Sequence, residues 1–93
     1  MKAVWKYLLT TTGYQELELP ANAKLLTVHA QDEMPCLWVL VDPDERKVTQ
    51  GIWIVGTGEL ANIEGDYVGT FHLVAGAFVF HVFAEKNKTG EVG

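Results

Sequence analysis

Apolar and polar residues alternate with a period of two along most of the chain, and apolar positions at helical spacing are nearly absent. The alternation is clearest from residue 14 to residue 19, where Leu17 and Leu19 are interleaved with Glu16 and Glu18. Such a segment is typical of a strand that buries one face and exposes the other. The pattern therefore predicts β-structure rather than helix.

Turn-forming residues divide the alternating stretches into six or seven short, mainly antiparallel strands. The expected strands are Lys2–Leu9, Tyr14–Leu19, Lys24–Gln31, Cys36–Val41, Lys47–Val55, Tyr67–Leu73 and Ala77–Ala84. In the third, Leu26, Val28 and Ala30 are expected to share one face. The Cys36–Val41 segment is apolar at every position, so we expect a central, fully buried strand there. One short helical turn is expected at residues 59–63.

These strands predict one all-β domain over residues 1–84, built as a small barrel or a sandwich. A chain of 93 residues is long enough for one domain and too short for two. Residues 85–93 are charged and contain glycine, so a flexible tail is expected there. Hydrophobic residues make up 48% of the chain, more than a domain of this size easily hides, and this surplus predicts a homo-oligomer.

The last expected hairpin has two alternative registers. A two-residue loop at Ala75-Gly76 places His72 and His81 on one face and Phe71, Leu73, Phe78 and Phe80 on the other. A bulged three-residue loop shifts the pairing by one residue and separates the two histidines. Segregation of apolar residues favours the first register, whereas the cost of a positive φ at Ala75 favours the second.

The formal net charge is −5, from seven basic and twelve acidic residues. An acidic surface repels a phosphate backbone, so general nucleic-acid binding is not expected. The single cysteine cannot form an internal disulfide, no stretch resembles a membrane span, and the N-terminal residues lack the pattern of a secretion signal. These features predict a protein of the reducing cytoplasm without membrane contact.

Three histidines, His29, His72 and His81, are the candidates for metal binding or acid–base catalysis. A metal site needs three or four convergent ligands, and no tight group of such residues is visible in the sequence. We therefore expect ordinary roles at the sheet surface for them. The sequence predicts no metal ion, no cofactor and no catalytic residue.

A small set of residues is expected to contact an anionic ligand, should the protein bind one. The set is Arg46, Lys47, Gly56, Thr57, Gly58, His72 and His81. The Gly56-Thr57-Gly58 turn follows an apolar strand, so its N–H groups are candidates to hold a phosphate. It lacks complete phosphate-binding motifs, however, which favours a plain exit from the strand. Arg46 and Lys47 adjoin a turn, where a solvated charge is the commoner role.

Two further features have ordinary explanations. Cys36 lies in an apolar run without an activating base nearby, which predicts a small core residue rather than a nucleophile. Asp42, Asp44 and Glu45 resemble part of a calcium loop, but the later ligands and the loop glycine are missing. A solvated turn is therefore expected at these acidic residues.

Several segments carry a family resemblance. They are Trp5-Lys6-Tyr7, Leu19-Pro20-Ala21-Asn22-Ala23, Cys36-Leu37-Trp38-Val39-Leu40-Val41-Asp42-Pro43, Ile54-Val55-Gly56-Thr57-Gly58 and the hairpin from Gly69 to Phe83. Over residues 3–84 the chain resembles a group of short uncharacterised proteins encoded by bacteriophages and prophages. The resemblance implies a small accessory protein inside an infected bacterium, and it implies no catalytic residues.

Three hypotheses for the function follow. The first is a non-enzymatic, homo-oligomeric accessory protein that counters a host defence, either by sequestering a nucleotide-like immune messenger or by blocking a host protein. Trp5, Trp38 or Trp53 would then be candidates to stack on a base, although core positions are commoner for aromatics. The second is a virion or tail component, which predicts exposed strand edges and large apolar contacts. The third is a small hydrolase using His72 and His81, which would need an orienting carboxylate.

Overall fold

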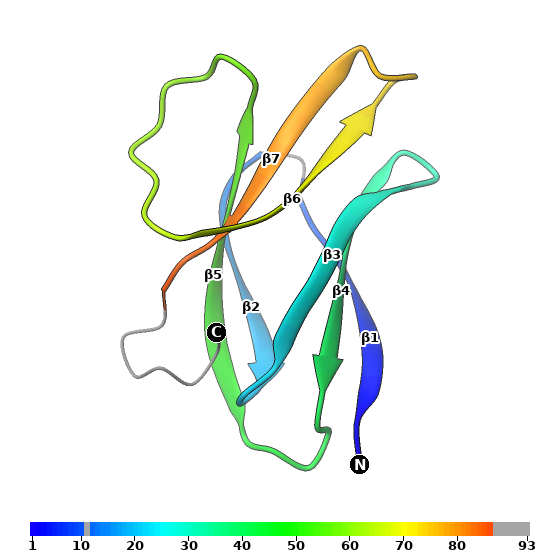
Figure 1. The fold of residues 1–93 in the computed structure, drawn as a ribbon, viewed down its shortest axis with the longest axis vertical. Coiled ribbons are helices and arrows are strands. Elements are labelled where there is room, and N and C mark those ends of the chain that lie inside the picture. The colour runs from blue at the N-terminus through cyan, green and yellow to red at the C-terminus, as the bar shows by residue number, and fades with distance from the viewer. Residues whose placement is uncertain (11, 87–93) are drawn as a thin grey trace.

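The computed structural model of the chain describes residues 1–10 and 12–86. Seven antiparallel strands form two sheets packed face to face, so the all-β prediction is confirmed, as a sandwich rather than a closed barrel (Figure 1). The strands are β1 (Ala3–Leu8), β2 (Gly13–Pro20), β3 (Lys24–Gln31), β4 (Met34–Val41), β5 (Lys47–Gly56), β6 (Asp66–Leu73) and β7 (Phe78–Ala84). The prediction of a helical turn at 59–63 is wrong, because these residues form no helix in the structure. Five residues without a cap or a packing face cannot offset the cost of helix nucleation.

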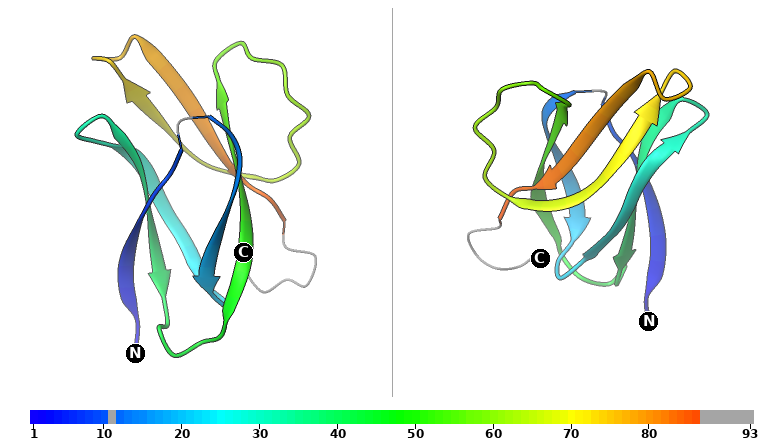
Figure 2. Two further views of the ribbon diagram at one scale, coloured as in Figure 1. Left: turned by 180° about the vertical axis from the view of Figure 1, so that it is seen from behind. Right: turned by 45° about the horizontal axis from the view of Figure 1, so that its top comes forward.

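One sheet has three strands in the order β1-β4-β3, and the other has four in the order β2-β5-β7-β6. The chain changes sheet three times, between β1 and β2, between β2 and β3, and between β4 and β5 (Figure 2). β4 is the central strand of its sheet, as predicted. Its expected burial on both faces is wrong: Trp38 and Leu40 are half-buried, because they point away from the second sheet.

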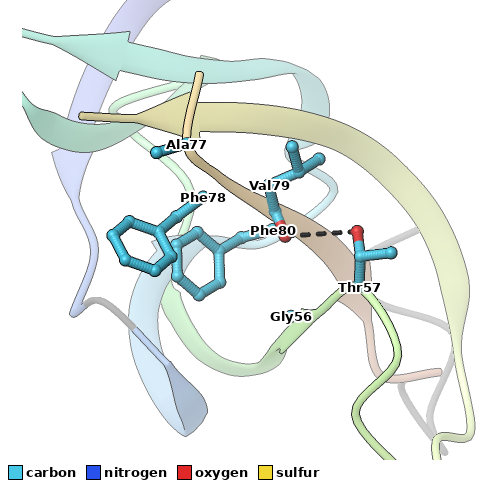
Figure 3. A pocket seen from close by; sticks show the side chains of 6 residues that line it. All are labelled: Gly56, Thr57, Ala77, Phe78, Val79 and Phe80. Atoms are coloured by element: carbon cyan, nitrogen blue, oxygen red, sulfur yellow. Dashed lines mark hydrogen bonds between the residues drawn. The ribbon is translucent and has the colours of Figure 1, made fainter. Parts of the chain in front are cut away.

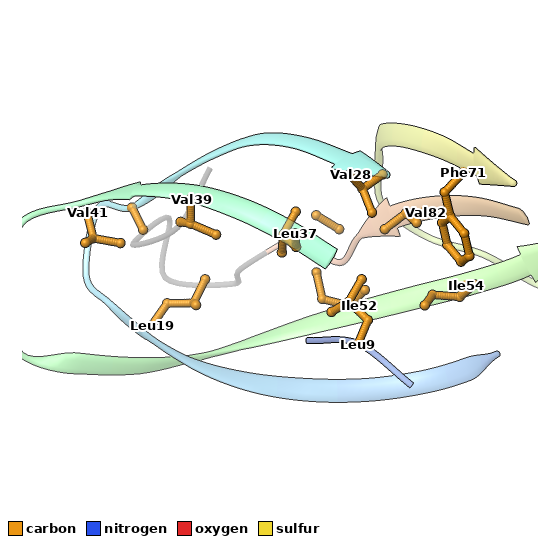
Figure 4. Packing of buried hydrophobic residues seen from close by; sticks show 12 residues of the cluster. Leu9, Leu19, Val28, Leu37, Val39, Val41, Ile52, Ile54, Phe71 and Val82 are labelled. Atoms are coloured by element: carbon orange, nitrogen blue, oxygen red, sulfur yellow. The ribbon is translucent and has the colours of Figure 1, made fainter. Parts of the chain in front are cut away.

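The core lies between the two sheets and is made from the inward positions of both (Figure 4). Its most deeply buried apolar side chains include Leu19, Leu37, Val39, Ile52, Ile54, Phe71 and Val82. Each buried side chain of this size contributes roughly 1.5–3 kcal/mol by leaving water. The inward positions recur at every second residue, which is why the period-two pattern predicted the strands.

A β-bulge in β3 changes the face that was expected for one residue. The pairing with β4 shifts between Leu25 and Thr27, so Leu25 packs against the core and Leu26 is exposed. Val28 is buried and inward-facing as expected. An extra residue in one strand reverses the alternation locally, and strict alternation could not predict it.

The last hairpin has the first of the two expected registers. Phe71 pairs with Phe80, and His72 and His81 lie on the opposite face from them. This register requires the positive φ at Ala75 that was expected to be costly, and φ there is 51°. Apolar segregation therefore outweighs loop strain at this hairpin.

Two hydrogen bonds join Glu85, the first residue of the expected tail, to β5. The N–H of Glu85 donates to the carbonyl of Gly51 at 2.9 Å, and Nε2 of Gln50 donates to the carbonyl of Glu85 at 2.8 Å. Residues 87–93 of the expected tail lie outside the described residues. Among the residues that the structure describes, no helix is long and apolar enough to cross a membrane.

Candidate functional site

A pocket of about 270 Å³ opens where β5 ends and β7 begins. Its lining is Gly56, Thr57, Ala77, Phe78, Val79 and Phe80 (Figure 3). The rings of Phe78 and Phe80 lie on one side of β7, and Val79 points to the other (Figure 3). A Cβ on Gly56 would lie 3.7 Å from the Phe80 ring, so the missing side chain leaves room beside that ring. The pocket is therefore mainly apolar, with the Thr57 hydroxyl as a polar group.

A chain of hydrogen bonds crosses the outer face of the four-stranded sheet next to the pocket. Oγ1 of Thr57 lies 2.7 Å from Nε2 of His81, and Nδ1 of His81 lies 3.1 Å from Oγ1 of Thr70. The Tyr67 hydroxyl continues the chain, 2.6 Å from Thr70 Oγ1. Both ring nitrogens of His81 thus bond to hydroxyl groups rather than to a carboxylate. Through these bonds the His81 ring on β7 joins Thr57, at the end of β5, to Thr70 on β6.

The other two histidines occupy separate positions. His72 is exposed on the same face as His81, two pairs further along the hairpin, opposite Val79. His29 lies on the three-stranded sheet and stacks on Trp38, with ring centroids 4.4 Å apart. Within residues 1–10 and 12–86, no three His, Cys, Asp or Glu residues are close enough to hold a metal ion together.

The predicted ligand-contact residues fall into two groups at opposite ends of the sandwich. Gly56 and Thr57 line the pocket, and His81 bonds to Thr57 on the outer face of the sheet. Lys47 begins β5 at the other end, directly after Arg46. A strand of ten residues separates the groups by about 30 Å. Nζ of Lys47 lies 4.7 Å from the centre of the Trp5 ring there. A single small anion cannot contact both groups within one copy of the chain.

Two N–H groups at the Gly56-Thr57-Gly58 turn, those of Thr57 and of the following Glu59, bond to backbone carbonyls of the protein. The Thr57 N–H donates to the Val79 carbonyl at 3.1 Å, and the Glu59 N–H donates to the Gly56 carbonyl at 3.0 Å. A phosphate cradle needs several convergent free N–H groups. The geometry is that of a strand exit followed by a tight turn.

Cys36 and the acidic turn at Asp42 have the ordinary structural roles expected from the sequence. Cys36 is buried, and its Sγ lies 3.4 Å from the carbonyl oxygen of Met34. The Asp42 carboxylate accepts a hydrogen bond from the Asp44 N–H at 3.0 Å and so closes the turn between β4 and β5. The acidic side chain acts on its own backbone, as the turn interpretation predicted.

A row of four aromatic residues that was not predicted from the sequence crosses the outer face of the four-stranded sheet. Tyr14, Trp53, Phe83 and Tyr67 pair in register, one from each strand, and we call them the aromatic row. The ring centroids of Tyr14 and Trp53 are 5.0 Å apart, and those of Tyr67 and Phe83 are 5.7 Å apart. Alternation places each residue on the outer face, but only the strand order brings the four together.

Two carboxylates converge on the hydroxyl at one end of the aromatic row. The Tyr14 hydroxyl lies 3.0 Å from Oε1 of Glu85 and 3.2 Å from Oε2 of Glu16. Desolvation, and then the hydrogen bond to Glu85, raise the pKa of Tyr14 to about 12. Tyr14 therefore keeps its proton at neutral pH, and its hydroxyl donates hydrogen bonds to the Glu16 and Glu85 carboxylates.

The sequence was also compared with known proteins. The chain matches no curated protein and no solved structure. A family described as a domain of unknown function, DUF7352, matches residues 1–92. That match covers the whole sandwich, and the chain belongs to the DUF7352 family.

Proposed function

We propose that the chain is a non-enzymatic binding protein that blocks a partner protein. An apolar side chain of the partner would enter the pocket between the end of β5 and the start of β7. The observation that carries the proposal is the pocket itself, with Phe78 and Phe80 on one wall and no side chain at Gly56. Buried apolar anchors of this kind dominate the energy of protein interfaces.

The size and charge of the pocket favour a protein partner over a nucleotide-like messenger. Its volume of about 270 Å³ is slightly below the roughly 300–1,000 Å³ of sites that enclose drug-sized ligands. It suits a single aromatic or aliphatic side chain. No lysine or arginine lines it, whereas a nucleotide brings phosphate charges that need cationic partners. To sequester a nucleotide-like messenger, the pocket would need Arg46 and Lys47 of another copy of the chain beside it.

The rim of the pocket has the character of an interaction surface. Val74 and Phe78 are 57% and 56% exposed, and both lie at the end of the β6–β7 hairpin, whose residues 77–80 line the pocket. Val74 also has a φ of 52°, an unusual conformation for a β-branched residue. Strained, exposed backbone of this kind concentrates at binding sites. These residues would surround the anchoring side chain and exclude water from it.

The resemblance to bacteriophage and prophage proteins suggests which kind of protein the partner is. We propose a host defence protein, blocked inside an infected bacterium. A virion or tail role remains the alternative, supported by the uncovered outer sheet faces. The hydrolase hypothesis has the least support, because the partners of the His81 ring are threonine hydroxyls.

A pocket-filling variant tests the proposal. Gly56→Val places its Cβ in ordinary contact with Phe80 and its methyl groups in the pocket, so the fold is retained. The wild type serves as bait in lysate from defence-competent bacteria, and the captured protein is identified, purified and titrated against both forms. We expect Gly56→Val to weaken binding at least tenfold, while the remote control Lys47→Ala binds like the wild type.

Two results would contradict the proposal. One is equal affinity of the purified partner for the wild type and for Gly56→Val. The other is a nucleotide-like molecule released when wild-type protein reisolated from infected cells is denatured, with no protein partner found. The second result would return sequestration to first place.

A further inference from the structure

The outer face of the three-stranded sheet is apolar and basic, and no other part of the described chain covers it (Figures 1 and 2). Its outward positions include Val4, Lys6, Leu8, Lys24, Trp38 and Leu40, which we call the basic face. Val4 and Leu8 are 55% and 59% exposed. Lysines provide the charge of this face, and no outward position on its three strands carries a carboxylate.

The outer face of the four-stranded sheet has the opposite charge. Around the Tyr14 end of the aromatic row it presents Tyr14, Glu16, Glu18, Trp53 and Glu85, which we call the acidic face. Glu18 is held outward by a 2.7 Å hydrogen bond from the Thr49 hydroxyl. The 57–65 connection runs on the same side of the sheet, beside β5 and β7 (Figures 1 and 2). The acidic face therefore comprises the part of the sheet nearest β2.

We propose that a second copy of this chain covers these faces, with the basic face of one copy stacked on the acidic face of the next. Charge complementarity identifies the occupant, because each face offers the apolar centre and the charges that the other lacks. A contact between two basic faces would oppose Lys6 and Lys24 to the same residues. Sheets stack face to face at about 10 Å, so both apolar centres would be buried.

The contact is heterologous, since two different surfaces meet, and it can repeat from copy to copy. It is independent of the proposed function. The pocket is lined by Phe78 and Phe80, which point to the inner side of the four-stranded sheet rather than to either outer face. Stacked copies would therefore each keep an open pocket.

Two charge-reversed variants test the stacking. One carries Lys6→Glu and Lys24→Glu on the basic face, and the other carries Glu16→Lys and Glu18→Lys on the acidic face. All four side chains are exposed strand residues, and circular dichroism and thermal unfolding check that both variants fold. Sedimentation velocity over a concentration series measures association of the wild type, of each variant and of their equimolar mixture.

We expect the wild type to associate at low salt and each variant alone to be monomeric. The mixture should associate again, because the reversed faces complement each other. Raising the salt from about 0.05 M to about 0.5 M should weaken association of the wild type several-fold, as the screening length shortens.

Three results would overturn the stacking. They are a monomeric wild type at millimolar concentration, a mixture that stays monomeric, and an acidic-face variant that associates as well as the wild type. The last would show that two basic faces meet instead. Gly56→Val should associate normally, and the charge-reversed variants should keep their affinity for a pocket partner, so failure of one proposal leaves the other standing.

Discussion

The Glu33 carboxylate accepts a 2.6 Å hydrogen bond from the backbone N–H of Val74, and this bond joins the tips of two hairpins from different sheets. Glu33 lies in the turn between β3 and β4, and Val74 follows β6. The bond holds the Val74 backbone, whose φ is 52°, in place at the tip of the β6–β7 hairpin.

We predict that Glu33→Ala loosens the β6–β7 hairpin tip. Losing the bond should cost about 1 kcal/mol of unfolding free energy and speed hydrogen exchange at the N–H groups of Val74 and Ala77. Glu64→Ala is the control, because it removes one exposed carboxylate from the 57–65 connection. Equal exchange rates in Glu33→Ala and the wild type would show that the bond contributes nothing.

Ala75→Asn should stabilise the same hairpin. Ala75 and Gly76 both have positive φ, at 51° and 87°, and Asn-Gly is the favoured pair for a two-residue hairpin turn. Asparagine tolerates the left-handed region better than alanine, so we expect a gain of roughly 1 kcal/mol in denaturant unfolding. Ala77→Asn, just outside the positive-φ residues, should give no gain, and a comparable gain there would refute the conformational explanation.

Gly69→Ala should destabilise the contact between the edges of the two sheets. A Cβ at Gly69 would lie 2.7 Å from Cγ1 of Val28, which is buried and cannot easily move. We expect a loss of roughly 1–3 kcal/mol, typical of overpacking. In the double variant with Val28→Ala, the two losses should be less than additive, and full additivity would disprove the steric conflict.

Stability should fall at high pH as Tyr14 loses its proton. Its pKa is raised from 10.0 to about 12, so the folded state favours the protonated form. The resulting stabilisation is complete below pH 10 and is lost as the pH rises from 10 towards 12. Titration of tyrosinate absorbance, with Tyr14→Phe to identify the signal, measures this pKa.

Glu85→Gln separates the causes of the Tyr14 shift. Glutamine removes the charge, so the pKa of Tyr14 should drop part of the way back towards 10 while desolvation still holds it above that value. An unchanged pKa in Glu85→Gln would exclude Glu85 as a cause.

The strands were predictable because apolar residues recur at most inward positions with a period of two. The expected bounds of Lys24–Gln31 match β3, and the other strands differ by one or two residues at their ends. The bulge beside Leu26 and the pairing of β1 with β4 were not predictable, because both depend on contacts between residues distant in sequence.

The candidate site was predictable only in part, for the same reason. Gly56 and Thr57 stood out as a glycine turn after an apolar strand, but only the pairing of β5 with β7 brings His81 next to Thr57. Arg46 and Lys47 were grouped with them by charge, although the length of β5 separates the two groups. The aromatic row required the strand order β2-β5-β7-β6, which local sequence does not specify.

The interleaved strand pairing constrains the order in which the chain can fold during its synthesis. β1 pairs with β4 and β2 pairs with β5, so Trp5 meets Val39 and Leu17 meets Gln50 only after long loops close. Hairpins such as β3–β4 close in roughly 1–10 μs, whereas pairing distant strands is far slower. Both N-terminal strands therefore leave the ribosome without partners, and their apolar faces stay unprotected until β4 and β5 emerge.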